Sequence, residues 1–247
     1  MKKLLLFLSV ITVVALMTSC IERNNSYNDR DLVYIAVSEN GVLHGRTTGR
    51  IITSRNIRQG LPTADGVVFE PGNFYIFSFH WEEANGRVAL GENVAADSVT
   101  ITSPVIEVPS ASLTMSPPED LPNMQSFVSI LQPWFERDAF WWGDNWIFSF
   151  LYRGGVNPPE LEFFKRDNPE NSDNIDIDIR IPTSSTGTNP QDREGIVAVN
   201  MSELRSKYQL EDRDRMLNIR FHFYQEGQAT LHTSEPIPWR LIRPSQQ

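Results

Sequence analysis

The chain has 247 residues, of which 40% are hydrophobic and 11% aromatic, so it can fold by burying apolar side chains and is not disordered. Its 31 acidic residues and 22 lysines and arginines give a formal charge of −9, which excludes the basic surface that nucleic-acid binding requires. One cysteine in the whole chain excludes an internal disulfide.

The N-terminus has the pattern of an export signal. A basic pair precedes an apolar run over residues 4–16, which is too short to cross a bilayer because a span needs about 20 apolar residues. Residues 16–20 read Leu-Met-Thr-Ser-Cys and resemble a bacterial lipobox, whose cysteine receives a diacylglycerol before cleavage. We therefore predict a signal peptide over residues 1–19 and lipidation at Cys20.

Acylation at Cys20 implies a membrane as the first partner, since two or three acyl chains attach a protein stably. We expect a lipid-anchored protein of the bacterial cell envelope, in the outer membrane, with the face of that membrane left open. Loss of the leader removes two lysines and changes the formal charge from −9 to −9 − 2, or −11. An acidic body of this kind does not favour binding to anionic lipid headgroups or to nucleic acid.

Residues 20–31 are polar and predict a solvated tether, and the pattern after them predicts a small barrel over residues 32–110. Apolar side chains alternate along two stretches, 33–37 and 75–81, as in strands with one buried face. The pair Asn40-Gly41 follows the first stretch and favours a hairpin. About five short strands and no confident helix are the content of an OB-like β-barrel.

Prolines separate this region from the second half. Four of them fall within residues 109–122, so we predict a linker over residues 111–122 and a second domain over residues 123–247. Apolar residues spaced three and four apart over residues 124–131 predict a short amphipathic helix.

Strand patterns dominate the second domain. Apolar side chains alternate over residues 146–152, 175–181, 197–201 and 219–223, which predicts an antiparallel β-sandwich. The glycine pair at 154–155 predicts a turn into a returning strand. A brief helix is expected after Asn200, ending near Tyr208.

The order of these features resembles the NigD-like lipoprotein family. The resemblance rests on the lipobox and tether, on Phe-Glu-Pro-Gly at residues 69–72, on Asp-Asn-Trp-Ile-Phe-Ser-Phe at residues 144–150, and on Gly-Ile-Val-Ala-Val at residues 195–199. It covers nearly the whole mature chain and implies an N-terminal OB-type barrel and a C-terminal sandwich, in lipoproteins of Gram-negative anaerobes. Pro158-Pro159 departs from the family pattern. The family contributes no established activity and no catalytic residues.

The sequence contains few motifs that indicate catalysis or metal binding. Motifs for a nucleophile elbow, a phosphate loop and a zinc helix are absent from it. None of the four histidines has metal-ligand spacing, and His80 and His222 are expected to face solvent from mid-strand positions. The acidic run 167–178 lacks the glycine of a calcium loop and predicts a solvated loop that leads into a strand with a polar outer face. We expect no catalytic residues, no metal and no cofactor.

Aromatic residues give the better functional lead. Trp141 and Trp142 are adjacent, so strand alternation cannot bury both, and one is expected to face outward beside Asp144 and Asn145. An exposed indole stacks on sugars or anchors a partner protein. The alternative is that the indoles cover the junction between barrel and sandwich.

Three classes of function follow. The first is a non-catalytic lipoprotein that acts in binding or assembly at the cell envelope, with another envelope protein or a glycan as partner. The second is a glycan-binding surface lipoprotein that uses Trp141 or Trp142. The third is a glycoside hydrolase with dispersed carboxylates, which would show two acids in one cleft.

Overall fold

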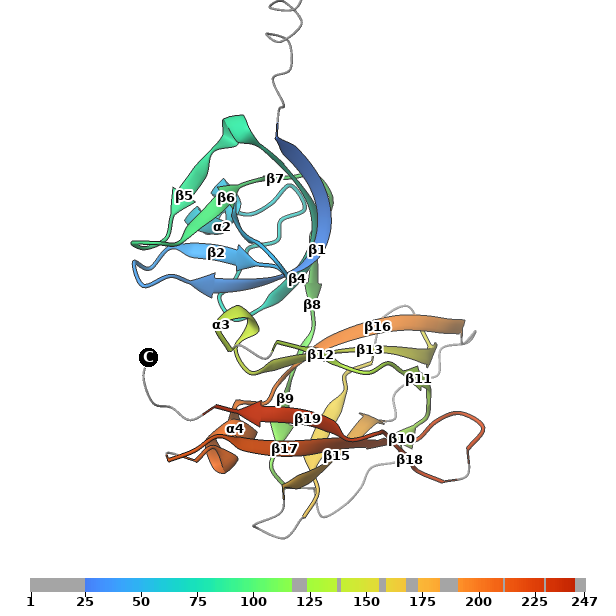
Figure 1. The fold of residues 1–247 in the computed structure, drawn as a ribbon. Coiled ribbons are helices and arrows are strands. Elements are labelled where there is room, and N and C mark those ends of the chain that lie inside the picture. The colour runs from blue at the N-terminus through green and yellow to red at the C-terminus, as the bar shows by residue number, and fades with distance from the viewer. Residues whose placement is uncertain are drawn as a thin grey trace, which may run out of the picture.

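The computed structural model describes residues 25–116, 124–136, 139–155, 159–167, 173–182, 191–210, 212–228 and 230–242. These residues form an all-β protein with a curled barrel sheet followed by a two-layered sandwich (Figure 1), which confirms the predicted fold class. The predicted signal peptide and Cys20 lie outside the described residues. None of the described helices is long and apolar enough to span a membrane.

The barrel sheet has eight strands in the order β5-β6-β3-β2-β1-β4-β7, with β8 also paired to β4. Its elements, which include two very short helices, are β1 (Ser26–Val37), β2 (Leu43–Arg46), β3 (Ile51–Thr53), α2 (Arg55–Gln59), β4 (Phe74–Glu82), η1 (Glu83–Asn85), β5 (Arg87–Ala89), β6 (Ala95–Ser98), β7 (Thr100–Ile101) and β8 (Ile106–Val108).

Alternation along β1 and β4 builds the barrel core as predicted, but β1 begins earlier than expected. Residues 26–31 fall within the predicted tether and instead pair with β4, from Ser26 opposite Glu82 to Asp31 opposite Phe77. Val33 and Ile35 of β1 and Phe77 of β4 have no exposed area, and they pack in one cluster inside the curled sheet. β1 and β2 pair as a hairpin, and Gly41 turns the chain between them with a φ of 74°, where a residue without a Cβ is unstrained. The predicted Asn40-Gly41 hairpin is thus confirmed.

The sandwich is one eleven-stranded sheet folded into two layers, with β9 joining them (Figure 1). One layer contains β11 (Phe127–Ile130), β12 (Trp134–Phe135), β13 (Asn145–Gly154) and β16 (Gln191–Asn200). The other contains β10 (Met124–Gln125), β14 (Glu162–Lys165), β15 (Asn174–Pro182), β17 (Arg215–Phe223), β18 (His232–Thr233) and β19 (Ile237–Leu241). Isoleucines from β15 and aromatic rings from β13 and β17 fill the space between the layers.

Two sequence predictions for this region were wrong. Residues 124–131 form β10 and β11 instead of a helix, because Phe127 is fully buried and the segment pairs with neighbouring strands. Residues 111–114 of the predicted linker belong to β9 (Ser110–Thr114), which runs parallel to both β14 and β16. Residues 115 and 116 follow β9 as a bend, and the remaining linker residues 117–122 lie outside the described residues.

The sandwich is also mixed rather than purely antiparallel. Besides the two parallel pairings of β9, β15 runs parallel to β17. β13 pairs with β16 and not with β14, so the glycine pair at 154–155 does not lead into a hairpin. The short helix α4 (Ser202–Tyr208) forms where it was expected, and Asn200 Oδ1 accepts a hydrogen bond from the Ser202 N–H at 2.9 Å.

Barrel and sandwich share a third apolar cluster. Leu32, Phe74 and Val108 from the barrel pack with Ile147 and Ala198 from the sandwich. Trp142, from the short helix α3 (Ala139–Trp142), lies in the same cluster. The two parts therefore meet through a buried apolar contact.

Candidate binding site at the sandwich seam

The structure does not open the predicted aromatic patch to solvent. Trp142 is 1% exposed and meets the Phe74 ring edge-on at 5.8 Å between centroids, in the junction between barrel and sandwich. Trp141 is half-buried against the same cluster. A covering role at the junction, which was the alternative, describes both indoles better than an exposed platform.

The two polar residues of the predicted patch are also engaged within the fold. Asp144 forms an ion pair with Arg205 of α4, and its carbonyl accepts a hydrogen bond from the Met201 N–H at 2.9 Å. Asn145 Nδ2 donates to the Trp142 carbonyl at 2.7 Å. These contacts hold α3 against β13 and α4, so the polar residues of the predicted patch stabilise the fold.

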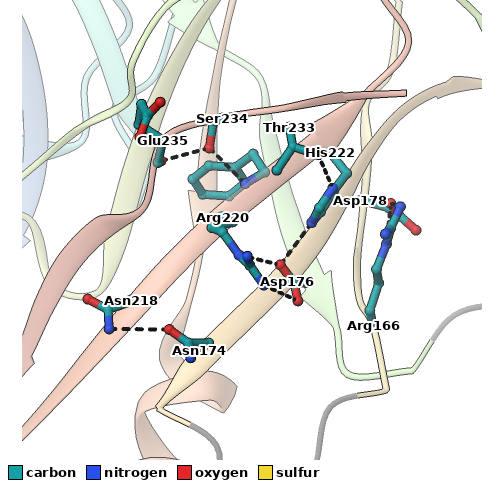
Figure 2. A network of polar contacts seen from close by, with 11 residues as sticks. Arg166, Asn174, Asp176, Asp178, Asn218, Arg220, His222, Thr233, Ser234 and Glu235 are labelled. Atoms are coloured by element: carbon teal, nitrogen blue, oxygen red, sulfur yellow. Dashed lines mark hydrogen bonds and ion pairs between the residues drawn. The ribbon is translucent and has the colours of Figure 1, made fainter. Parts of the chain in front are cut away.

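A polar network covers the outer face of β15 and β17 (Figure 2). Asp178 lies between two arginines: Arg166 Nη2 is 2.7 Å from Oδ1, and Arg180 Nη2 donates to Oδ2 at 2.9 Å. Asp178 and Arg180 are each 6% exposed, so the outer face of β15 is polar but not solvated as expected. Burial is tolerated because each charge has an opposite partner.

His222 is 7% exposed, which corrects the prediction of a solvated position. Its Nε2 lies 2.8 Å from Asp176 Oδ1 and its Nδ1 lies 2.9 Å from Thr233 Oγ1 (Figure 2). Asp176 is also paired with Arg220, whose Nη2 donates to Oδ2 at 2.9 Å. Since a carboxylate only accepts, Nε2 donates to Asp176, and in the neutral ring this leaves Nδ1 to accept from the Thr233 hydroxyl.

The order hydroxyl, imidazole, carboxylate is the one that nucleophilic enzymes use. Catalysis would further need hydrogen-bond donors for a developing oxyanion. The Ser234 N–H, next to Thr233, instead donates to the Phe221 carbonyl at 2.8 Å. The network ties β18 to the outer face of β17 and β15.

The barrel contains a smaller polar cluster. The Tyr27 hydroxyl donates to Asp97 at 2.9 Å, and the Tyr27 ring stacks on Trp81 with centroids 5.3 Å apart. Burial, helped by Asp97, raises the pKa of Tyr27 to about 12. Because Asp97 also pairs with Arg87, this carboxylate already has its partners within the barrel.

The edges of the two sandwich layers lie beside each other along one side, which we call the seam. One layer ends in β11 and β12, which both pair with β13, and the other ends in β18 and β19, which both pair with β17. One end of the seam is closed by Phe127, whose N–H donates to the Tyr224 carbonyl at 2.9 Å. At the other end Phe135 stacks on Trp146 at 4.1 Å, and Trp146 meets Trp239 edge-on at 5.5 Å.

Between these two closures the seam opens into a cavity of about 220 Å³. The rings of Phe148, Phe221 and Phe223 line it, and all three belong to the sandwich core. Its lips are the residues that connect the paired edge strands, 131–133 on one side and 234–236 on the other. The cavity thus ends on core aromatic rings that are themselves buried.

The rim combines apolar and polar side chains. Leu131 lines the opening although it is 59% exposed. The opposite lip contributes His232, Ser234 and Glu235, and the His232 ring lies 4.7 Å from that of Phe223. A concave apolar space with a few polar groups at its mouth is the usual form of a binding site.

Sequence reasoning missed this site. The site lies between segments about one hundred residues apart in the chain. The alternation of apolar and polar residues predicts which side chains face the core, but it does not predict where two sheet edges remain unpaired. The available signal was Pro133 and Pro236, because a proline inside a strand-like segment interrupts hydrogen bonding at a sheet edge.

A second and larger hollow, of about 510 Å³, lies beside β9 and β14. Glu160 and Glu162 both line it, together with Ser112 and Thr114. A glycosidase needs two acids that flank the scissile bond from different sides. Glu160 and Glu162 come from one segment, on either side of the buried Leu161, so they face the hollow from the same wall.

Among the described residues no three His, Cys, Asp or Glu side chains gather into a metal-binding group. The part of the acidic run 167–178 that the structure describes puts Asp176 and Asp178 into ion pairs with arginines.

Comparison with known proteins identifies the fold. No family model and no curated protein matches the chain. Among solved structures, an uncharacterised protein of Parabacteroides merdae matches with a TM-score of 0.57 and 11% identity, over 87% of this chain and 100% of that one. A Bacteroides fragilis protein provisionally named a lipoprotein matches with a TM-score of 0.56 and 9% identity, over 88% and 100%. A protein of Parabacteroides distasonis that is provisionally named toxin-related matches with a TM-score of 0.53 and 11% identity, over 87% of this chain and 94% of that one. The chain is therefore similar in fold to these solved chains over most of its length.

Proposed function

We propose that this protein is a non-catalytic, lipid-anchored lipoprotein of NigD-like type that binds a partner at the cell envelope through the seam cavity. One observation carries the proposal: a cavity of about 220 Å³ leads from solvent to the aromatic core, between two lips that do not pair with each other among the described residues. A sandwich that needed only stability would fill this gap, since side chains that line an unfilled space lose packing contacts.

The leader and Cys20 support an envelope location, and the fold shared with a provisionally named lipoprotein of Bacteroides fragilis supports the same class. We place the acyl chains of Cys20 in the outer membrane. The two ends of the molecule then have different tasks: the chain is anchored through the start of β1, and the sandwich at the opposite end of the barrel carries the binding site (Figure 1).

Binding explains the polar groups better than catalysis does. Asp176 and Asp178 are neutralised by arginines, so neither is placed to exchange protons with a substrate. Glycan capture by Trp141 or Trp142 is less well supported, because Trp142 is buried and Trp141 is half-buried against the same cluster. The seam offers apolar contact instead, which favours a protein partner over a sugar.

The anchor is tested by Cys20→Ala, with Ser206→Ala on the exposed side of α4 as control. We expect Cys20→Ala to lose metabolic labelling with an alkynyl fatty acid and to leave the membrane fraction, because no other thiol can be acylated. Ser206→Ala should behave as the unchanged protein. A Cys20→Ala protein that stays labelled and membrane-bound would contradict the proposed class.

A further inference from the structure

The lips of the seam cavity limit how a partner can engage it. Sheet edges commonly bind partners by accepting an added strand, which requires a continuous row of backbone donors and acceptors. Pro133 interrupts one lip and Pro236 the other, and proline has no N–H to donate. On the second lip, Ser234 is also committed to β17: its N–H donates to the Phe221 carbonyl, and its Oγ accepts from the Phe221 N–H at 2.9 Å. An added strand would therefore find broken edges, and a side chain must provide the anchor.

The size of the cavity sets which side chain fits. A dry cavity of about 150 Å³ lined by aliphatic and aromatic residues holds one benzene molecule. The seam cavity, at about 220 Å³, has room for one aromatic or large aliphatic side chain and is below the roughly 300 Å³ at which drug-sized ligands are bound. Its aromatic lining favours edge-on contact with a further ring.

The rim supplies a charge preference. Glu235 is exposed, lines the mouth and forms no ion pair within the described part of the chain. The whole chain has a formal charge of −9, so its field also attracts cations. A positive side chain next to the inserted ring would meet Glu235 at the opening.

We infer that the seam cavity binds a partner protein through one phenylalanine-like side chain that is followed by a lysine or arginine in an extended segment. This inference deepens the proposed function and rests on it. The ring enters between Leu131 and His232 and reaches Phe221 and Phe223, while the cation stays outside beside Glu235. The partner segment contributes side chains rather than a paired strand.

The test uses the mature chain, residues 20–247, with Cys20→Ala so that no acyl group or detergent competes for the cavity. Three acetylated peptide amides serve as probes: Gly-Phe-Lys-Gly, Gly-Ala-Lys-Gly and Gly-Phe-Glu-Gly. Amide chemical shifts of the labelled protein are followed as each peptide is added. We expect the first peptide to shift the amides of residues 130–132, 232–235 and 237, and the alanine peptide to shift neither segment. The glutamate peptide should bind roughly twofold to fivefold more weakly, as for an exposed ion pair.

Two variants make the test specific. Glu235→Gln should reduce the difference between the lysine and glutamate peptides to what the net charge of the chain alone produces, and keep binding of the ring. Leu131→Ala should weaken the first peptide severalfold, whereas Met216→Ala, an equally apolar truncation at a 48% exposed position of β17 outside the cavity, should not.

Three outcomes would overturn the inference: equal binding of the alanine peptide, shifts confined to other surfaces, or shifts at the seam that appear with protein concentration alone and so indicate a second copy. Failure here with Cys20 acylation intact would remove the partner chemistry and leave the lipoprotein class standing. Loss of the anchor in the Cys20 test would not change peptide binding.

Discussion

Trp142 shows how a residue predicted for binding is used for packing. Its indole fills the junction between barrel and sandwich, and its Nε1 is buried without a hydrogen-bond partner in the described structure. Burying an N–H without a partner costs about 1 to 3 kcal/mol. The large apolar contact of the ring offsets that cost, which explains a tryptophan at a position where its polar atom has no use.

Substitutions at Trp142 separate these two contributions. Trp142→Ala should lower the free energy of unfolding by about 3 to 5 kcal/mol through the cavity it leaves. Trp142→Phe should cost much less, because it removes the unpaired N–H along with part of the ring. Trp134→Ala, at a 58% exposed position, should change stability by less than about 0.5 kcal/mol. Denaturant unfolding of the three variants checks this, and equal losses for alanine and phenylalanine at position 142 would contradict it.

At the residue scale the sequence could show that Trp141 and Trp142 differ in burial, but not which one is inside. Alternation assumes a strand, whereas residues 139–142 form the short helix α3, where neighbours diverge by a different angle. His222 was missed for a related reason. Its position opposite Phe221 and Phe223 is polar, and only the tertiary pairing with Asp176 and Thr233 makes that position buried.

β9 is the element on which the sandwich depends most visibly. It is only five residues long, yet it pairs in parallel with β16 on one side and with β14 on the other, and so joins the two layers. Leu113 from this strand is 3% exposed and belongs to the sandwich core. Without β9 the two layers would have unpaired edges facing each other at this side.

This predicts a sharp boundary for a folded fragment. A fragment of residues 109–247 should unfold cooperatively, whereas one of residues 116–247 should not, because it lacks β9. Thermal unfolding followed by circular dichroism distinguishes the two. The shared cluster at the junction will leave the longer fragment less stable than the whole chain. Cooperative unfolding of both fragments would show that β9 is dispensable.

At the element scale, strong alternation located β4, β13, β15, β17 and the second half of β1, because each buries at least one face. Residues 26–31 are mostly polar, so the sequence predicted a tether where β1 begins. The partners of these strands could not be predicted. Parallel pairing of β15 with β17 and of β9 with both its neighbours depends on contacts between distant segments. The wrongly predicted helix at residues 124–131 has the same cause. A short apolar stretch fits the periodicity of a helix and of a strand equally well, and here pairing with β13 and β15 makes it strand.

The whole molecule consists of two β structures that meet through a buried apolar cluster, with an opening at the seam of the second. The barrel connects the predicted anchor to the sandwich, and the start of β1 lies at the end of the barrel away from the sandwich (Figure 1). Under the proposed function, this arrangement holds the seam cavity away from the membrane. The cavity itself could not be foreseen, since it exists only because two sheet edges diverge after Phe127.

The central claim is that this protein binds an envelope partner through the seam cavity. Site-specific photocrosslinking in living cells tests it most directly, with benzoylphenylalanine placed at Leu131 on the rim and, as control, at Met216 on β17, which are 59% and 48% exposed. We predict a discrete adduct from position 131 alone, with the crosslink mapped to an aromatic or large aliphatic residue beside a lysine or arginine. No adduct at 131, or the same adducts from both positions, would contradict the account.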